Sequence, residues 1–310
     1  MKQKNIKQVV LPLLSALIWG SAFTAQSLSA GHIPAFTFNA LRSVAAVAAL
    51  LVVIFIMRRG SGPNRRSAAE KKETRRALVR GGICCGVFLT LGSNLQQLGI
   101  ERTSVGKAVF ITALYVVLVP LLGLFFRKRV SPQVWGSVVI ATFGLYFLCI
   151  DGETGFSINT GDFFVLLCAF CFTGQILCVD HFVQKVDPVE LSCAQFVVVT
   201  VISAFASLVR GETVVLSEVA ACLPYILYVG IFSSGVAYTL QIIAQKDGDP
   251  TIVSLLLCLE SFFAALCGAL VLHETLSGRE YLGCALMLAA VFLSQIPEKA
   301  RKPVESRDKV

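Results

Sequence analysis

Ten long apolar stretches, separated by short polar ones, constrain the fold of this chain more than any other feature. A helix needs about 20 mostly apolar residues to cross about 30 Å of hydrocarbon. Such stretches occur at 9–30, 34–57, 81–100, 105–126, 133–150, 162–179, 189–209, 219–243, 251–272 and 279–296. The sequence therefore predicts an all-α integral membrane protein with ten transmembrane helices.

Composition supports the same class. Charged residues make up 15% of the chain, whereas a soluble domain usually has about 25%. Many of the eleven cysteines lie inside apolar stretches, where they act as small hydrophobic residues. Cys168 and Cys171 are three apart, but no second pair or histidine accompanies them. We expect neither a metal site nor a cofactor.

The distribution of Lys and Arg predicts the orientation in the membrane. With ten spans both termini lie on one side, and that side carries most of the 27 basic residues. The longest basic segment, 58–80, is expected to be a solvated loop near anionic lipids. Positive residues favour the cytoplasmic side. The prediction is a multi-pass protein of the bacterial inner membrane with cytoplasmic termini, and the net charge of +8 implies no nucleic-acid partner.

An internal repeat divides the spans into two sets of five. Gly20 and Pro34 are 14 residues apart, and so are Gly174 and Pro188 in the same context of span, loop and next span. Because five is odd, the second set enters the membrane from the opposite side, as in many transporters. The predicted units are 1–153 and 154–297, followed by a cytoplasmic tail at 298–310.

Several short motifs together resemble one family. They are Ala16–Ser21 (ALIWGS), Phe38–Arg42 (FNALR), Phe110–Pro120, Ser254–Glu260 and the pair His273-Glu274. The chain resembles the EamA-type transporters of the drug/metabolite transporter superfamily. That resemblance implies a ten-helix carrier of two repeats, often an exporter of amino acids, other metabolites or toxic compounds. Two positions depart from the family: Ser261 replaces its usual proline, and Arg127-Lys128-Arg129 replaces Gly-Glu.

Two ionisable residues lie deep within predicted spans. Arg42 is about eight residues into the second span and Glu260 about nine into the ninth, so both lie near the bilayer midplane. A charge there is costly and commonly functional. We interpret them as groups that bind substrate or couple transport to a proton. The alternatives are a structural pair, or Arg42 extending to the membrane surface.

Polar and aromatic residues along the spans are further candidates for lining a cavity. They are Trp19, Ser21, Asn94, Gln97, Tyr115, Gln175, Gln195, Tyr238 and Gln241. The alternative role for each is hydrogen bonding between helices. Pro120 interrupts the backbone bonds of the fourth span, as a hinge or as a fixed kink.

Neither a catalytic motif nor a nucleotide-binding motif is found in the sequence. The predicted function is therefore secondary active transport and not an enzymatic activity. The expected substrate is a small metabolite, such as an amino acid, exported by alternating access. The alternatives are a membrane-embedded enzyme, a lipid-modifying protein or a passive channel. The expected partners are the substrate, the lipid bilayer and protons as the coupling ion, and the sequence predicts no oligomeric state.

Overall fold

A computed structural model describes residues 6–60, 67–125, 130–150, 159–271 and 277–296, and helices account for most of them. Up to residue 150 the helices are α1 (Lys7–Ser29), α2 (Ala35–Gly60), α3 (Ala68–Ile100), α4 (Val105–Ala113), α5 (Tyr115–Phe125) and α6 (Pro132–Cys149). Beyond it lie α7 (Thr160–Phe182), α8 (Pro188–Val209), α9 (Leu216–Tyr228), the π-helix η1 (Val229–Ala237), α10 (Tyr238–Asp247), α11 (Pro250–Leu257), α12 (Glu260–Val271) and α13 (Gly278–Gln295). Within these ranges there are no strands.

Nine helical segments in the described ranges are long and apolar enough to cross a membrane. The prediction of an all-helical, multi-pass membrane protein is therefore confirmed. The last expected span, 279–296, corresponds to α13, which falls outside these nine. Its 18 residues include Arg279 and Glu280 in the first turn, which lower its hydropathy.

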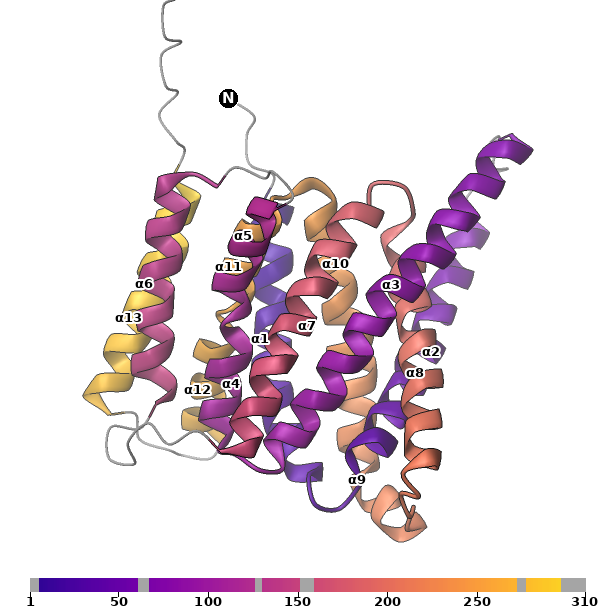
Figure 1. The fold of residues 1–310 in the computed structure, drawn as a ribbon, viewed down its shortest axis with the longest axis horizontal. Helices are drawn as coiled ribbons and strands as arrows, with labels where there is room; N and C mark the ends of the chain where they lie inside the picture. The colour runs from indigo at the N-terminus through magenta and orange to yellow at the C-terminus, as the bar shows by residue number, and fades with distance from the viewer. Residues whose placement is uncertain (1–5, 61–66, 126–129, 151–158, 272–276, 297–310) are drawn as a thin grey trace, which may run out of the picture.

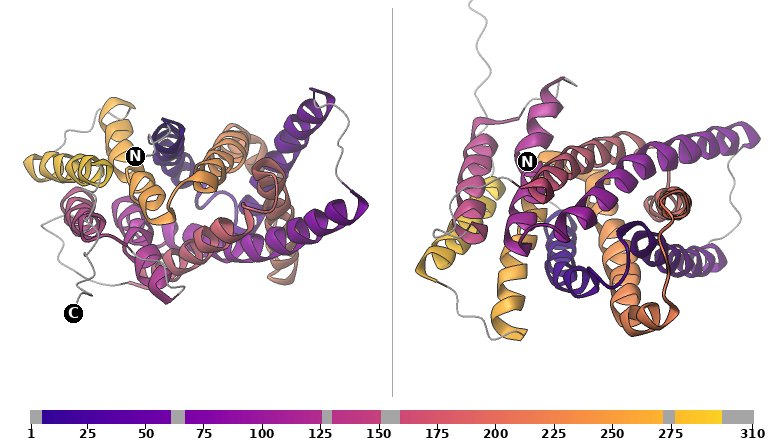
Figure 2. Two further views of the ribbon diagram at one scale, coloured as in Figure 1. Left: turned by 90° about the horizontal axis from the view of Figure 1, so that it is seen from above. Right: turned by 60° about the horizontal axis from the view of Figure 1, so that its bottom comes forward.

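The helices form a bundle with two distinct edges (Figure 1). The pair α6 and α13 packs together at one edge, while α2, α3 and α8 contact one another at the other. In both views of Figure 2, α13 and the start of α3 lie far apart. Helix α1 lies between these edges and contacts η1, α10, α11 and α12. Large apolar side chains such as Phe55, Phe205 and Phe292 are exposed, as expected for a surface that faces lipid.

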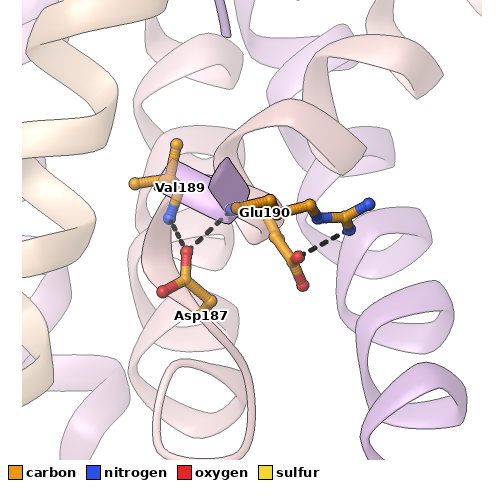
Figure 3. Close-up of polar contacts among 4 residues, drawn as sticks. Asp187, Val189 and Glu190 are labelled. Carbon is orange, nitrogen blue, oxygen red and sulfur yellow. Dashed lines mark hydrogen bonds and ion pairs between the residues drawn. The ribbon is translucent and has the colours of Figure 1, made fainter. Parts of the chain in front are cut away.

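Polar residues define where the helices begin. Asp187 accepts hydrogen bonds from the amides of Val189 and Glu190, and Pro188 occupies the first turn of α8 (Figure 3). Glu190 also forms an ion pair of 2.9 Å with Arg58 of α2. Asp249 caps α11 in the same way. These two Asp-Pro pairs are therefore helix caps.

The prediction of a loop over 58–80 is wrong in part. Helix α2 continues to Gly60, and α3 already begins at Ala68. Ser67 and Glu70 form a capping box, in which each side chain bonds the other's backbone amide. The Ala, Glu, Lys and Arg residues that follow favour helix, so polarity here marks a helix outside the membrane. Arg127–Arg129, His273 and Glu274 lie outside the described residues.

Candidate functional site

Two spans are interrupted near their centres. In the span 105–125, α4 ends at Ala113 and α5 begins at Tyr115. In the span 250–271, α11 ends at Leu257 and α12 begins at Glu260. Tyr115 and Glu260 each lie ten positions after the first residue of their span, Val105 and Pro250. The Tyr115 hydroxyl donates a hydrogen bond of 3.2 Å to Glu260 Oε1. The two interruptions therefore meet.

A small cavity surrounds this meeting point. It has a volume of about 40 Å³ for a water-sized sphere, room for about two or three waters. Seven of the eleven residues proposed from the sequence line it: Trp19, Arg42, Tyr115, Gln175, Tyr238, Gln241 and Glu260. They come from α1, α2, α5, α7, α10 and α12. Residues far apart in the sequence thus converge in one place, which we call the central cavity.

Arg42 and Glu260 are both buried in the wall of the central cavity, 4% and 3% exposed. Arg42 Nη1 donates to Gln26 Oε1 at 3.2 Å, and its guanidinium lies 5.8 Å from the centre of the Phe38 ring. Its Nε is buried without a hydrogen-bond partner in the described part of the chain. Among described residues the ion pairs do not include these two side chains. An ionisable base and an ionisable acid therefore share one cavity with few polar partners.

Aromatic rings form another part of the wall. Trp19 Nε1 donates a hydrogen bond of 3.2 Å to the backbone carbonyl of Ser233 in η1. The rings of Trp19 and Tyr238 are 4.7 Å apart. A π-helix is rare and is often found at functional sites. Trp19 thus connects α1 to the irregular part of the eighth span.

The arrangement of buried charges, aromatic rings and interrupted helices can be compared with known proteins. The EamA-like transporter family matches residues 6–150 and 159–295. This chain belongs to the EamA-like transporter family. An uncharacterized transporter of Archaeoglobus fulgidus is 30% identical over 282 residues, covering 90% of this chain and 83% of that protein.

More distant relatives extend the comparison. The WAT1-related chloroplastic protein At3g02690 of Arabidopsis thaliana is 26% identical over 214 residues, covering 64% of this chain and 50% of that protein. A crystal structure with 18% identity covers 94% of this chain with a TM-score of 0.75. At that identity the likeness shows the fold alone. Family and relatives identify a membrane transporter, and the resemblance drawn from the sequence motifs is confirmed.

Four glutamines of the transporter form a chain beside the central cavity. Gln241 Nε2 donates to Gln175 Oε1 at 3.2 Å and to Gln245 Oε1 at 3.1 Å. Gln175 Nε2 donates in turn to Gln195 Oε1 at 3.2 Å. Gln175 and Gln241 line the cavity, while Gln195 lies behind them. Gln241 Oε1 has no partner among the described residues, so an unpaired buried acceptor lies in the middle of this chain.

Asn94 and Gln97 do not line the cavity. Asn94 accepts a hydrogen bond from Asn39 and donates to Ser203 Oγ and the Thr90 carbonyl. We call Asn39, Asn94 and Ser203 the asparagine cluster; it joins α2, α3 and α8. On α3 the residue that lines the cavity is Gln96, which bonds Thr112 at 3.3 Å. Adjacent helical residues point about 100° apart, so the choice of Gln97 was off by one position.

The sequence analysis also missed lining residues on α1. Phe23 and Gln26 follow Trp19 at four and seven positions, so all three lie on one face of the helix. That spacing was a signal that could have identified Gln26. The remaining lining residues missed from the sequence are Gln96, Thr112, Phe172, Ile176, Ser233 and Leu257.

Two other candidates have different positions. Ser21 lies outside the cavity wall and is 2.6 Å from the Tyr228 hydroxyl. Pro120 is buried within α5, six residues after the interruption at Leu114. The fourth span therefore breaks before its proline. Groups of His, Cys, Asp and Glu that could hold a metal are absent from the described ranges.

Proposed function

We propose that this transporter is a secondary active exporter of small metabolites, such as amino acids, and that it works by alternating access. The observation that carries the proposal is the equal spacing of the interruptions in the fourth and ninth spans, which meet in the central cavity. Carriers commonly place their binding site at such discontinuous helices near the midplane.

The pattern of helix contacts supports ten spans in two inverted repeats, 1–153 and 154–297. If spans one to five correspond to six to ten, each contact should have a counterpart. The counterpart of the contact α3–α7 is α10–α1, and that of α3–α8 is η1–α2. The counterpart of α5–α7 is α11–α1. The contacts α2–α8 and α6–α13 are their own counterparts. In this scheme α13 is the tenth span.

The chemistry of the central cavity favours an amphoteric substrate. Arg42 would attract a carboxylate, Glu260 an amine, and the glutamines and Trp19 would hydrogen-bond or stack on the remainder. At about 40 Å³ the cavity is too small for a metabolite, so substrate entry requires helices to separate. Separation of the helices toward one side of the membrane and then the other is the motion that alternating access requires.

A proton is the coupling ion that the cavity supports best. Glu260 is buried and, within the described ranges, accepts one side-chain hydrogen bond, from Tyr115. Keeping a carboxylate charged at a span centre costs about 2.5–3.5 kcal/mol on insertion scales. Either a proton or a substrate amine would remove that cost. Competition between them for Glu260 would couple export to proton entry.

The orientation with cytoplasmic termini and location in the inner membrane remain part of the proposal. Gln8 near the start of α1 donates to the Asp247 carbonyl at the end of α10, and Gln184 after α7 donates to the Lys246 carbonyl. The basic residues Lys7, Lys185 and Lys246 therefore lie at one end of the bundle. The positive-inside rule assigns that end to the cytoplasm.

The test is counterflow in proteoliposomes loaded with unlabelled amino acids, with labelled amino acids outside. A carrier gives saturable uptake that rises with internal substrate, and Glu260→Gln should remove the response to a pH gradient. Glu218→Gln, an exposed acid in the first turn of α9, is the matched control. Flux without stimulation by internal substrate would favour a channel, and a wild-type pH response in Glu260→Gln would refute the coupling role.

A further inference from the structure

The cytoplasmic end of α3 is longer than a membrane span requires. Its 33 residues reach about 50 Å at 1.5 Å per residue, whereas the hydrocarbon is about 30 Å thick. Charged residues fill the stretch from Glu70 to Arg80, and none occurs from Gly81 to Ile100. About one third of the helix, beginning at Ala68, therefore lies beyond the hydrocarbon. Figure 1 shows this part of α3 extending past the neighbouring helices.

A cleft of about 650 Å³ opens between this extension and the end of α7. Lys72, Arg76 and Arg80 line it from α3, and Lys185 lines it from the turn after α7. Glu73 is the one carboxylate in the cleft wall. Four cationic side chains against one acid make the cleft strongly electropositive.

In the described part of the chain, the four cations of the cleft form no ion pairs with acidic side chains. The ion pairs found in the described ranges join Arg58 to Glu190 and Arg102 to Glu101, and so involve none of the four. Lys185 Nζ lies 3.4 Å from Nε2 of His181, which carries no carboxylate and also lines the cleft. The charge is therefore available to an external anion.

The cleft leads directly into an apolar surface. Val79, Ile83 and Val87 are 53%, 51% and 37% exposed. At 3.6 residues per turn they lie on the same side of α3 as Lys72 and Arg76. Below the cleft the helices pack closely, because a Cβ at Gly81 would lie 2.9 Å from the Phe182 ring. A headgroup in the cleft would thus have its acyl chains along this stripe.

We propose that this cleft binds the phosphate headgroup of an anionic phospholipid of the cytoplasmic leaflet. Arg and Lys supply charge-assisted hydrogen bonds to phosphate oxygens. The apolar stripe favours a lipid over a soluble phosphate, since a free anion would gain nothing from it. Such binding is independent of what the central cavity transports, although the leaflet follows from the proposed orientation.

The test measures binding of dioleoyl-phosphatidylglycerol to the purified full chain in neutral micelles by native mass spectrometry. Lys72→Gln/Arg76→Gln should weaken binding about tenfold or more, since each basic residue near an anionic surface contributes about 1 kcal/mol. The control Lys71→Gln/Arg75→Gln removes the same charge from exposed residues outside the cleft wall and should change binding less than about twofold. Equal losses in the two variants would refute a built site.

Further binding measurements distinguish an anionic lipid from other anions as the ligand of the cleft. Phosphatidylcholine, which carries phosphate without net charge, should bind far more weakly. Inorganic phosphate should fail to displace phosphatidylglycerol, and full displacement would overturn the proposal in favour of a free-anion site. Should the double variant fold poorly, Lys185→Gln offers a second variant from the opposite wall, with an expected loss of about fivefold. Wild-type binding in a folded Lys185→Gln protein would also count against the site.

Discussion

The central cavity and the asparagine cluster are both buried and polar, yet they differ in how their polar groups are satisfied. In the asparagine cluster, Asn94 bonds Asn39, Ser203 and the Thr90 carbonyl, and none of the members is charged. In the cavity, Arg42 and Glu260 are ionisable, and among the described residues each makes one side-chain hydrogen bond. Asn39 Oδ1 of the cluster also lacks a partner among the described residues, but an unpaired neutral group costs less than an under-satisfied ionisable one, which within a span indicates a ligand.

Glu260→Gln should give the largest effect and should separate function from stability. Gln can still accept the hydrogen bond from Tyr115 but cannot exchange a proton. We expect gradient-driven transport to fall about 100-fold, as for loss of an essential proton-transfer group. The thermal unfolding temperature should stay the same or rise, because a buried charge is removed. A lower unfolding temperature together with normal transport would reverse the roles assigned to the two regions.

Arg42→Lys should have the next largest effect. The charge remains, but Lys lacks the planar fork that reaches Gln26 and a carboxylate together. We expect the apparent KM for substrate to rise about tenfold, the equivalent of about 1.4 kcal/mol of binding. Labelled-substrate uptake measures it, with Arg102→Lys at an exposed site as the control. An unchanged KM would remove Arg42 from the substrate site.

Gly20→Ala tests the packing that holds the cavity together. A Cβ at Gly20 would lie 2.6 Å from the Glu260 carbonyl oxygen and 2.7 Å from the Ala264 amide nitrogen. Because both atoms belong to backbone, α1 and α12 must separate, at a cost of about 1–3 kcal/mol. We expect a lower unfolding temperature and about three- to tenfold slower transport, about 0.7–1.4 kcal/mol in the barrier. Gly136→Ala, where a Cβ meets nothing within 4 Å, is the control.

Asn94→Ala should show the smallest change in transport. The variant loses three hydrogen bonds, which at about 0.6 kcal/mol each reduces stability by about 2 kcal/mol. Transport per folded molecule should be unchanged, as judged from uptake normalised to the monodisperse fraction. A selective loss of transport at normal stability would place Asn94 with the cavity residues and weaken the distinction between the two regions.

The class of the fold and much of the cavity could be predicted from the sequence, because both follow from the free-energy cost of placing polar or charged groups within a membrane. Apolar stretches of 18 or more residues have few alternatives to a membrane span, and charges such as Arg42 and Glu260 stand out within them. The asparagine cluster shows the limit of this reasoning. Asn94 and Gln175 have similar polarity and burial, and only the packing of neighbouring helices decides which of them faces the cavity.

Two features could not be predicted from composition or local preference. The interruptions at Leu114 and Cys258 fall among residues without Gly or Pro, while Pro120 lies inside a continuous helix. Tertiary contacts such as that between Tyr115 and Glu260 therefore determine where these spans break. The second feature is the direction in which the side chains of α3 point. Polar residues lie on several sides of α3 near its end, so the sequence does not show which of Gln96 and Gln97 faces the cavity.

The π-helix η1 has a consequence for how the sequence of this span can change. Its hydrogen bonds close over five residues instead of four, so it holds more residues per turn than α9 before it and α10 after it. A one-residue insertion or deletion within Val229–Ala237 can be absorbed by a change of helix type. Both flanking helices, including the face of α10 that presents Tyr238 and Gln241, would then keep their direction. The eighth span is thus where a gap in an alignment of the two halves would disturb the cavity least.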